Sequence, residues 1–319
     1  MPIQTAADSI SNSQGSPFGF KNRIINGAMV IDQRNAGASV TITSDNTFIT
    51  DRWSARSNVS SKYSAQQSST APTGFNYSLL ATSLSAYSVG AAEYFAFTQG
   101  VEGFNCADFG WGTANAQTVT LSFWVRSSLT GTFGGSLRNS DGTRSYPFTY
   151  TISSANTFEY KTITVSGDTS GTWITNNGLG IRLYFGLGVG STYRGTAGSW
   201  ASANYLSATS ATSVVGTNGA TFYITGVQLE KGSTATSFDY RPYGTELALC
   251  QRYFQKVTNI YVPDSASLPT NWYFKVSMRA TPTITGSGAG FGTFALNSDS
   301  VASRQTSAGG GTLTADIEL

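Results

Sequence analysis

Residues 179–190 read LGIRLYFGLGVG, and this stretch points most directly to the fold class. Every second position carries an apolar side chain: Leu179, Ile181, Leu183, Phe185, Leu187 and Val189. The positions between them hold four glycines together with Arg182 and Tyr184. A period of two predicts a β-strand with one buried face, and six apolar side chains contribute roughly 9–18 kcal/mol of gross burial. The pattern predicts a central strand, and its glycine-rich reverse face predicts close approach of another backbone or a sharp bend.

The same alternation recurs from about residue 22 to residue 240. In TVTLSFWVR, residues 118–126, the apolar side chains share one face while Trp124 lies on the opposite, polar face. In TFYITGVQLEKG, residues 221–232, the apolar positions change parity at Thr225 and Gly226, which predicts a β-bulge. Many strands separated by turn signals, with almost no helical pattern, predict an all-β sandwich or jelly roll.

The composition of the 319-residue chain agrees with a β protein and excludes several functions. Charged residues make up only 11%, while aromatic residues make up 13% and glycine occurs 35 times. A net charge of +2 without a basic stripe argues against nucleic-acid binding. The absence of histidine removes the commonest general base and metal ligand, and no DxDxD-like calcium motif occurs. We therefore expect no metal and no cofactor.

Targeting signals are also missing from the sequence. No apolar run reaches the ~18 residues of a membrane span, and the N-terminus lacks the basic and apolar regions of a signal peptide. We therefore expect synthesis in a cytoplasm, followed by retention there or departure inside a larger particle. Cys106 and Cys250 are far apart in sequence and form no zinc pattern. Buried free thiols are favoured for them, and a disulfide remains open.

The chain divides into three predicted regions. Residues 1–21 are small and polar, as expected of a flexible attachment arm that orders on a partner. Residues 22–244 form the predicted jelly roll. Residues 245–319 form a short helix and a small β domain. The helix is predicted in GTELALCQRYFQK, residues 244–256, with Thr245 as its N-cap. The final β segment is too thin to be stable alone, so we expect it to be buried against copies of itself.

The opening segment NRIINGAMVIDQRN, residues 22–35, allows two interpretations. Asp32, Gln33, Arg34 and Asn35 follow one another and resemble a small active site. They are also suited to capping the end of a strand, with Asp32 paired to Arg34 or Arg52. We favour the second interpretation and expect an opening strand whose buried face includes Ile25, Met29 and Ile31.

Several of these segments together resemble a widespread family of bacteriophage tail fibre and tail-associated structural proteins. The resemblance is carried by NRIINGAMVIDQRN, by FITDRWSARSN (residues 48–58), by residues 112–165 and 222–256, and by the terminal TADIEL. It covers nearly the whole chain from about residue 20. It implies a carbohydrate-binding-like jelly roll, a homotrimer and a place on the virion. It supplies no catalytic residues.

Sugar recognition requires aromatic platforms beside polar donors and acceptors. The long loop at residues 191–219 offers Tyr193, Arg194, Trp200, Asn204 and Tyr205, and Trp111 and Trp124 are weaker candidates. In the C-terminal region, a distal tip would expose Tyr261, Trp272, Tyr273 and Phe291. The alternative for both groups is structural: these side chains anchor loops or fill a trimer interface.

The predicted function is that of a virion adhesin. It would be attached to other virion proteins through residues 1–21 and would bind host polysaccharide or lipopolysaccharide, without nucleic acid or membrane insertion. A decoration protein of the head or tail is the first alternative, and a glycan depolymerase is the second. A glycosidase needs two acids about 5–10 Å apart. Glu93, Glu102, Asp108, Glu159 and Glu230 occur in no motif that pairs them, so we expect no enzyme.

Overall fold

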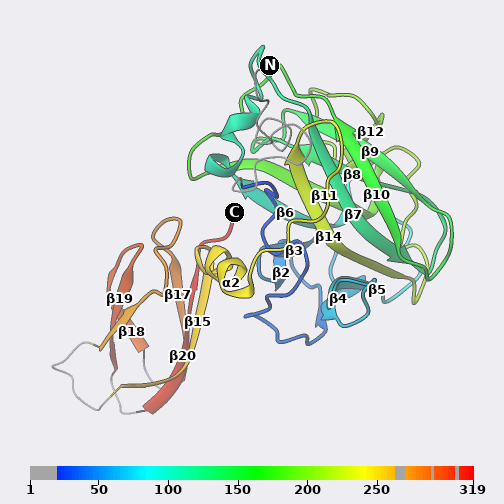
Figure 1. The fold of residues 1–319 in the computed structure, drawn as a ribbon. Helices are drawn as coiled ribbons and strands as arrows, with labels where there is room; N and C mark the ends of the chain where they lie inside the picture. The colour runs from blue at the N-terminus through cyan, green and yellow to red at the C-terminus, as the bar shows by residue number, and fades with distance from the viewer. Residues whose placement is uncertain (1–19, 263–269, 289–290, 306–308) are drawn as a thin grey trace, which may run out of the picture.

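The computed structural model describes residues 20–262, 270–288, 291–305 and 309–319. Two six-stranded sheets dominate it (Figure 1). Sheet A contains, in spatial order, β1 (Val40–Thr41), β4 (Tyr63–Ser68), β5 (Ser78–Ser83), β14 (Thr221–Lys231), β7 (Val119–Ser127) and β10 (Glu159–Val165). Sheet B contains β2 (Thr47–Thr50), β3 (Trp53–Ser57), β6 (Tyr94–Glu102), β11 (Leu179–Val189), β8 (Gly131–Arg138) and β9 (Ser145–Ile152). Neighbouring strands within each sheet are antiparallel.

The two sheets face each other across one large hydrophobic core. Trp53, Phe97, Phe123, Phe185 and Phe222 are completely buried there and come from both sheets. The chain crosses repeatedly between the sheets, as the order β6–β7–β8 illustrates, while β2–β3, β4–β5 and β8–β9 stay within one sheet as antiparallel pairs, and this is the connectivity of a jelly roll. The predicted all-β jelly-roll sandwich is therefore confirmed.

The predicted central strand is β11, which pairs with β6 on one side and β8 on the other. Its residues from Ile181 to Leu187 alternate as expected, and the apolar ones enter the core. A register shift between Gly186 and Gly188 then moves Val189 to the outer face, where it packs with Tyr184 and Leu206. A second register shift, between Leu179 and Ile181, leaves Leu179 half-buried and outside this core. The expectation that all six apolar side chains share one face was therefore wrong at both ends, because each shift inserts an extra residue.

The reverse face of β11 lies under the loop at residues 191–219, as its glycines predicted. A Cβ on Gly186 would lie 2.8 Å from Ser207 Oγ, and one on Gly188 would lie 2.6 Å from Val215 Cγ2. This loop contains η3 (Ser191–Tyr193), β12 (Arg194–Gly195) and β13 (Ser207–Ala208), and the last two pair in parallel. The 3-10 turns η1 (Gly103–Asn105) and η2 (Ala107–Phe109) follow β6.

The bulge predicted in β14 is present. The pairing of β14 with β7 shifts register between Thr225 and Gln228, and Gly226 adopts a φ of 59°. Ile224 before the shift and Val227 after it are both buried in the core. The extra residue thus allows even-numbered apolar residues before the bulge and odd-numbered ones after it to face the same core.

The opening segment is a series of turns, so the predicted strand over residues 22–35 was wrong. Asn26 and Met29 have positive φ values of 56° and 58°, which no strand accommodates. The Asn26 side chain closes the turn: its Nδ2 donates to the Ile31 and Asp51 carbonyls, and its Oδ1 accepts from the Ile31 N–H. Ile25, Met29 and Ile31 are nevertheless buried, as expected.

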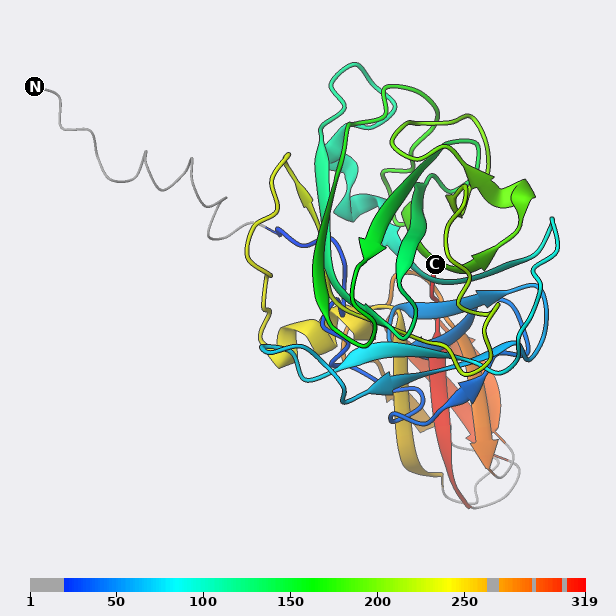
Figure 2. The same cartoon turned by 90° about the vertical axis from the view of Figure 1, so that its right-hand side faces the viewer.

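The C-terminal region follows a single helix, α2 (Tyr243–Gln251). The helix begins where it was predicted, but it ends at Gln251, and Phe254–Lys256, which were predicted to continue it, belong to the next strand. Pro242 occupies the N-cap in place of Thr245, without a side-chain cap bond. Two three-stranded sheets follow it: β15 (Phe254–Val262), β20 (Gly309–Asp316) and β17 (Thr283–Gly288) in one, and β16 (Thr270–Tyr273), β19 (Ser300–Gln305) and β18 (Phe291–Leu296) in the other. These strands project from the sandwich, and the chain then returns to it (Figures 1 and 2).

Two further features concern the length of the helices and the state of the two cysteines. No helix among the described residues is long and apolar enough to span a membrane. Cys106 and Cys250 are both buried and neither forms a disulfide. Burial raises the pKa of the Cys106 thiol to about 12 and raises that of Cys250 as well, which favours the protonated thiol over the reactive thiolate at both positions.

Candidate functional site

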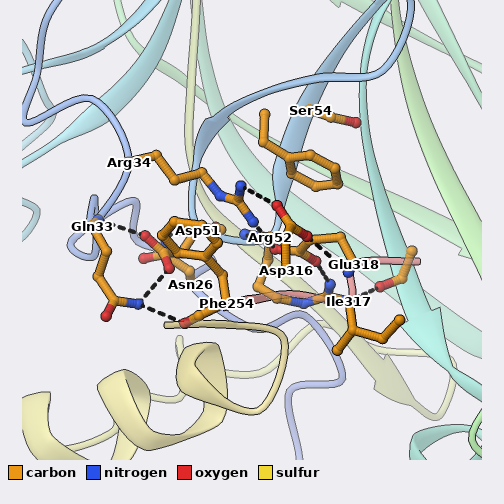
Figure 3. Close-up of polar contacts among 12 residues, drawn as sticks. Asn26, Gln33, Arg34, Asp51, Arg52, Ser54, Phe254, Asp316, Ile317 and Glu318 are labelled. Atoms are coloured by element: carbon orange, nitrogen blue, oxygen red, sulfur yellow. Dashed lines mark hydrogen bonds and ion pairs between the residues drawn. The ribbon is translucent and has the colours of Figure 1, made fainter. Parts of the chain in front are cut away.

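The polar run at Asp32–Asn35 is a structural junction (Figure 3). The Asp32 carboxylate accepts from the backbone N–H groups of Arg34, Asn35 and Gly37, so it caps a turn. The Arg34 guanidinium donates to Asp316 at 2.7 Å and to Glu318 at 3.0 Å. The predicted partner of Asp32 was therefore wrong: Arg34 pairs with the C-terminal TADIEL segment.

The rest of the junction uses the remaining polar groups of this run. The Gln33 backbone N–H and side-chain amide both donate to Asp51, at 2.7 Å and 2.6 Å. Arg52 is buried and pairs with Glu318. The Arg34 guanidinium also lies 3.8 Å from the ring centroid of Phe254. Each of these side chains is engaged by a protein partner, as expected of a junction between the two ends of the chain.

The predicted glycan candidates Trp111 and Trp200 lie together in an indole cluster. Their ring centroids are 5.2 Å apart, and Trp173 lies 4.8 Å from Trp111 and 5.4 Å from Trp200. Both indole N–H groups donate to backbone carbonyls, that of Trp111 to Gln117 and that of Trp200 to Ser166. Trp111 is only 6% exposed. This packing anchors the loop, and a glycan-binding role for the two residues stays a prediction.

The other four loop candidates lie apart from that cluster. The Tyr193 ring packs edge-on against Tyr94 at 5.5 Å. Arg194 lines a cavity of about 270 Å³ together with Tyr87 and Val189. The ring of Tyr205 lies against Gly195. Asn204 is exposed, and its Oδ1 accepts from Arg138. The structure therefore does not gather the six residues into one site.

In the C-terminal region, two tip candidates can be placed. Tyr273 is 71% exposed, and Trp272 is half-buried with its ring 5.1 Å from Phe274. The side chains of Tyr261 and Phe291 lie outside the described residues.

Each of the five carboxylates considered for catalysis has its own protein partner. Glu102 accepts from Arg252 and Tyr253, Asp108 from Arg23, and Glu159 from Lys161. Glu230 accepts from Thr236, and Glu93 accepts from Tyr87 and the Gly90 N–H. Within the described residues, no group of three or more His, Cys, Asp or Glu is arranged to hold a metal ion.

An open groove of about 600 Å³ crosses the outer face of sheet A. On neighbouring strands β7 and β10, Trp124 and Tyr160 lie opposite each other, with ring centroids 5.4 Å apart. The other wall comes from two loops and consists of Phe75, Phe238 and Tyr240, whose rings are 4.8–5.5 Å apart. Thr73, Ser122, Ala235, Thr236 and Ser237 also line it, so four of these residues carry hydroxyl groups.

The bulge of β14 shapes this groove. Gly226 forms part of the lining, and a Cβ there would lie 2.6 Å from the Phe75 ring and 3.1 Å from the Trp124 ring. The glycine therefore lets the two aromatic walls approach each other. Tyr160 and Tyr240 remain 44% and 59% exposed, so their rings are available to a ligand. Of the groove's aromatic residues, sequence patterning indicated only Trp124, which was on the polar face of its strand.

No protein-family model and no curated protein matches the sequence. Among solved structures, the chain is similar to the enzymatically active domain of tailspike protein 4 of bacteriophage CBA120, with 13% identity and a TM-score of 0.36. That match covers 66% of this chain and 21% of the tailspike chain, so the protein spans about a fifth of that relative.

A second similar structure is a family 11 carbohydrate-binding module from Clostridium thermocellum, in complex with a mixed-linked tetrasaccharide. It shows 12% identity and a TM-score of 0.31, and the match covers 62% of this chain and 98% of the module. The jelly-roll fold of this chain is shown by the order of the strands in its two sheets.

Proposed function

We propose that this chain is a non-enzymatic glycan-binding protein and that the groove of sheet A is its binding site. The observation that carries the proposal is the pairing of Trp124 with the exposed ring of Tyr160, facing a second aromatic wall across an open groove. Aromatic rings expose flat apolar faces, against which the C–H faces of sugar rings pack. A volume of about 600 Å³ is in the range of small-ligand sites.

The polar groups of the groove suit a neutral sugar chain. Its lining combines aromatic rings with hydroxyls from Thr73, Ser122 and Ser237. Hydroxyl groups both donate and accept hydrogen bonds, as sugar hydroxyls require.

Binding without hydrolysis is favoured by the state of the carboxylates. The five acids that sequence suggested are each engaged by a protein partner, and none of them lines the groove. A glycosidase would need two of them flanking the bound sugar.

The finer role rests on the sequence resemblance. By that resemblance, the protein is a homotrimeric virion adhesin that binds host polysaccharide or lipopolysaccharide. Residues 1–21 then attach it to other virion proteins. A decoration protein would have the same fold without the affinity for glycans.

The test is glycan binding by the full chain. Binding to an array of neutral polysaccharides and lipopolysaccharides is measured for the wild type, Trp124→Ala, Tyr160→Ala and the control Tyr243→Ala, which removes a ring that is 63% exposed and lies outside the groove lining. We expect at least a tenfold loss for the two groove variants and none for the control. Loss with Trp200→Ala but not with Trp124→Ala would move the site to the loop. No binding at all would favour decoration, and release of reducing sugar would establish a depolymerase.

A further inference from the structure

Arg182 is a buried charge that has no partner in the part of the chain that the structure describes, and it lies on the sheet opposite the groove. It lies in β11 with the parity of Tyr184, so it is on the outer face of sheet B, and only 9% of it is exposed. Among the described residues, no hydrogen bond or ion pair reaches its guanidinium, and its Nε is buried and unsatisfied. Buried charges in proteins are normally paired, because desolvation without compensation is costly.

The neighbours of Arg182 add positive charge. Arg138 is its direct cross-strand partner on β8, where like charges oppose each other unfavourably. The Nε of Arg138 is also buried and unsatisfied. The carboxylate of Asp45 is already used, since it accepts from both Nε and Nη2 of Arg56 at 2.7 Å.

The chain end does not neutralise this pair. Leu319 packs against Gly100, which is the strand neighbour of Arg182 on β6. Even so, the described residues include no ion pair between its carboxylate and Arg182. The two arginines therefore lie side by side on the outer face of sheet B, and within the described residues no ion pair reaches either guanidinium.

We propose that Arg182 and Arg138 bind the carboxylate of an acidic sugar, such as a uronate, at a second site on sheet B. A guanidinium offers two parallel N–H donors that match a carboxylate. The exposed Asn204 beside Arg138 uses its Oδ1 on Arg138, and its Nδ2 has no acceptor among the described residues. An acidic sugar supplies a carboxylate for the arginines and a hydroxyl for this amide. The inference rests on the proposed glycan-binding function, but on a different face.

The first test is calorimetric titration of the full chain with D-glucuronate, with D-glucose as the neutral control. The variants are Arg182→Gln, Arg182→Lys and Arg138→Gln, and Lys256→Gln is the control for one exposed positive charge. We expect wild-type binding to glucuronate but not to glucose, and at least a tenfold loss in Arg182→Gln. Arg182→Lys should lose part of the affinity, because it keeps the charge without the planar fork. Equal affinity in the wild type and Arg182→Gln overturns the proposal, as does no binding of glucuronate.

A second readout separates binding from structure. Since Arg182 has no described protein partner, Arg182→Gln should unfold at the same or a higher temperature than the wild type. A lower unfolding temperature with unchanged glucuronate affinity would make it a structural residue. Equal binding of inorganic phosphate or of an acidic peptide would overturn the assignment to a sugar. Arg182→Gln should retain neutral-glycan binding in the groove. Failure of glucuronate binding alone therefore counts against this site, and failure of neutral-glycan binding alone counts against the proposed function.

Discussion

Arg52 and Glu318 form an ion pair that is almost completely removed from solvent and joins residues 266 positions apart. Their side chains are 1% and 4% exposed. Glu318 also accepts from Arg34, and the Arg52 guanidinium lies 3.5 Å from the ring centroid of Tyr253. The last residues of the chain are thereby joined to the turn that precedes β3.

Glu318→Gln should strongly destabilise this junction. The substitution keeps the shape of the side chain but leaves Arg52 buried without a counter-charge, which costs about 3–5 kcal/mol. The measurement is the free energy of unfolding in urea. The control is Asp316→Asn: Asp316 is 38% exposed, so its pair with Arg34 contributes at most about 1 kcal/mol. Equal losses for the two variants would show that burial of the pair does not matter.

Asp51 should make stability depend on pH. Burial raises its pKa to about 6, although hydrogen bonds from Gln33 and the charge of Arg34 lower it, while Asp32 raises it. The folded protein therefore holds this proton more tightly than the unfolded chain. Stability should fall as pH rises from about 4 to about 6, by on the order of 3 kcal/mol.

Asp51→Asn tests this directly. The variant loses one hydrogen bond from Gln33 at every pH, because an amide nitrogen replaces one acceptor oxygen. The difference in unfolding free energy between wild type and variant should therefore decrease from pH 4 to pH 6 and stay constant above that. Parallel curves would contradict a raised pKa.

The sandwich was predictable because its signals are local. The alternation in β11 and the change of parity in β14 each lie within a dozen residues, so one strand reveals its own buried face. The turn at Asn26 was not predictable in this way. Its apolar residues are buried as expected, but the positive φ values depend on hydrogen bonds to Ile31 and Asp51. Burial was read correctly there and backbone conformation was not.

The groove and the junction depend on pairings between distant segments. Trp124 meets Tyr160 only because β7 and β10 are neighbours in one particular register. Arg34 meets Asp316 across 282 positions. A single sequence does not reveal which strands pair or in which register. The aromatic residues and the charges could therefore be identified from the sequence, but their partners could not.

Trp200 distinguishes a structural from a binding role. Its ring packs against Trp111, Trp173 and Tyr146, so Trp200→Ala should lower the unfolding free energy by about 2–3 kcal/mol and leave glycan binding intact. Tyr273→Ala, at a ring 71% exposed, should change stability by less than about 0.5 kcal/mol. Loss of glycan affinity in Trp200→Ala at unchanged stability would instead support the site that the sequence suggested.

Gly226 links the bulge of β14 to the groove, so Gly226→Ala should affect stability and binding together. A φ of 59° costs a non-glycine residue about 1–2 kcal/mol, and the new Cβ would also displace the ring of Phe75. The matched control is Gly219→Ala, where φ is 72° and nothing lies within 4 Å of the added Cβ. Both variants should lose stability in urea, Gly226→Ala by the larger amount. Only Gly226→Ala should weaken glycan binding, because only there does the methyl group separate the two aromatic walls. Identical losses and unchanged binding would mean that the glycine serves the backbone conformation alone.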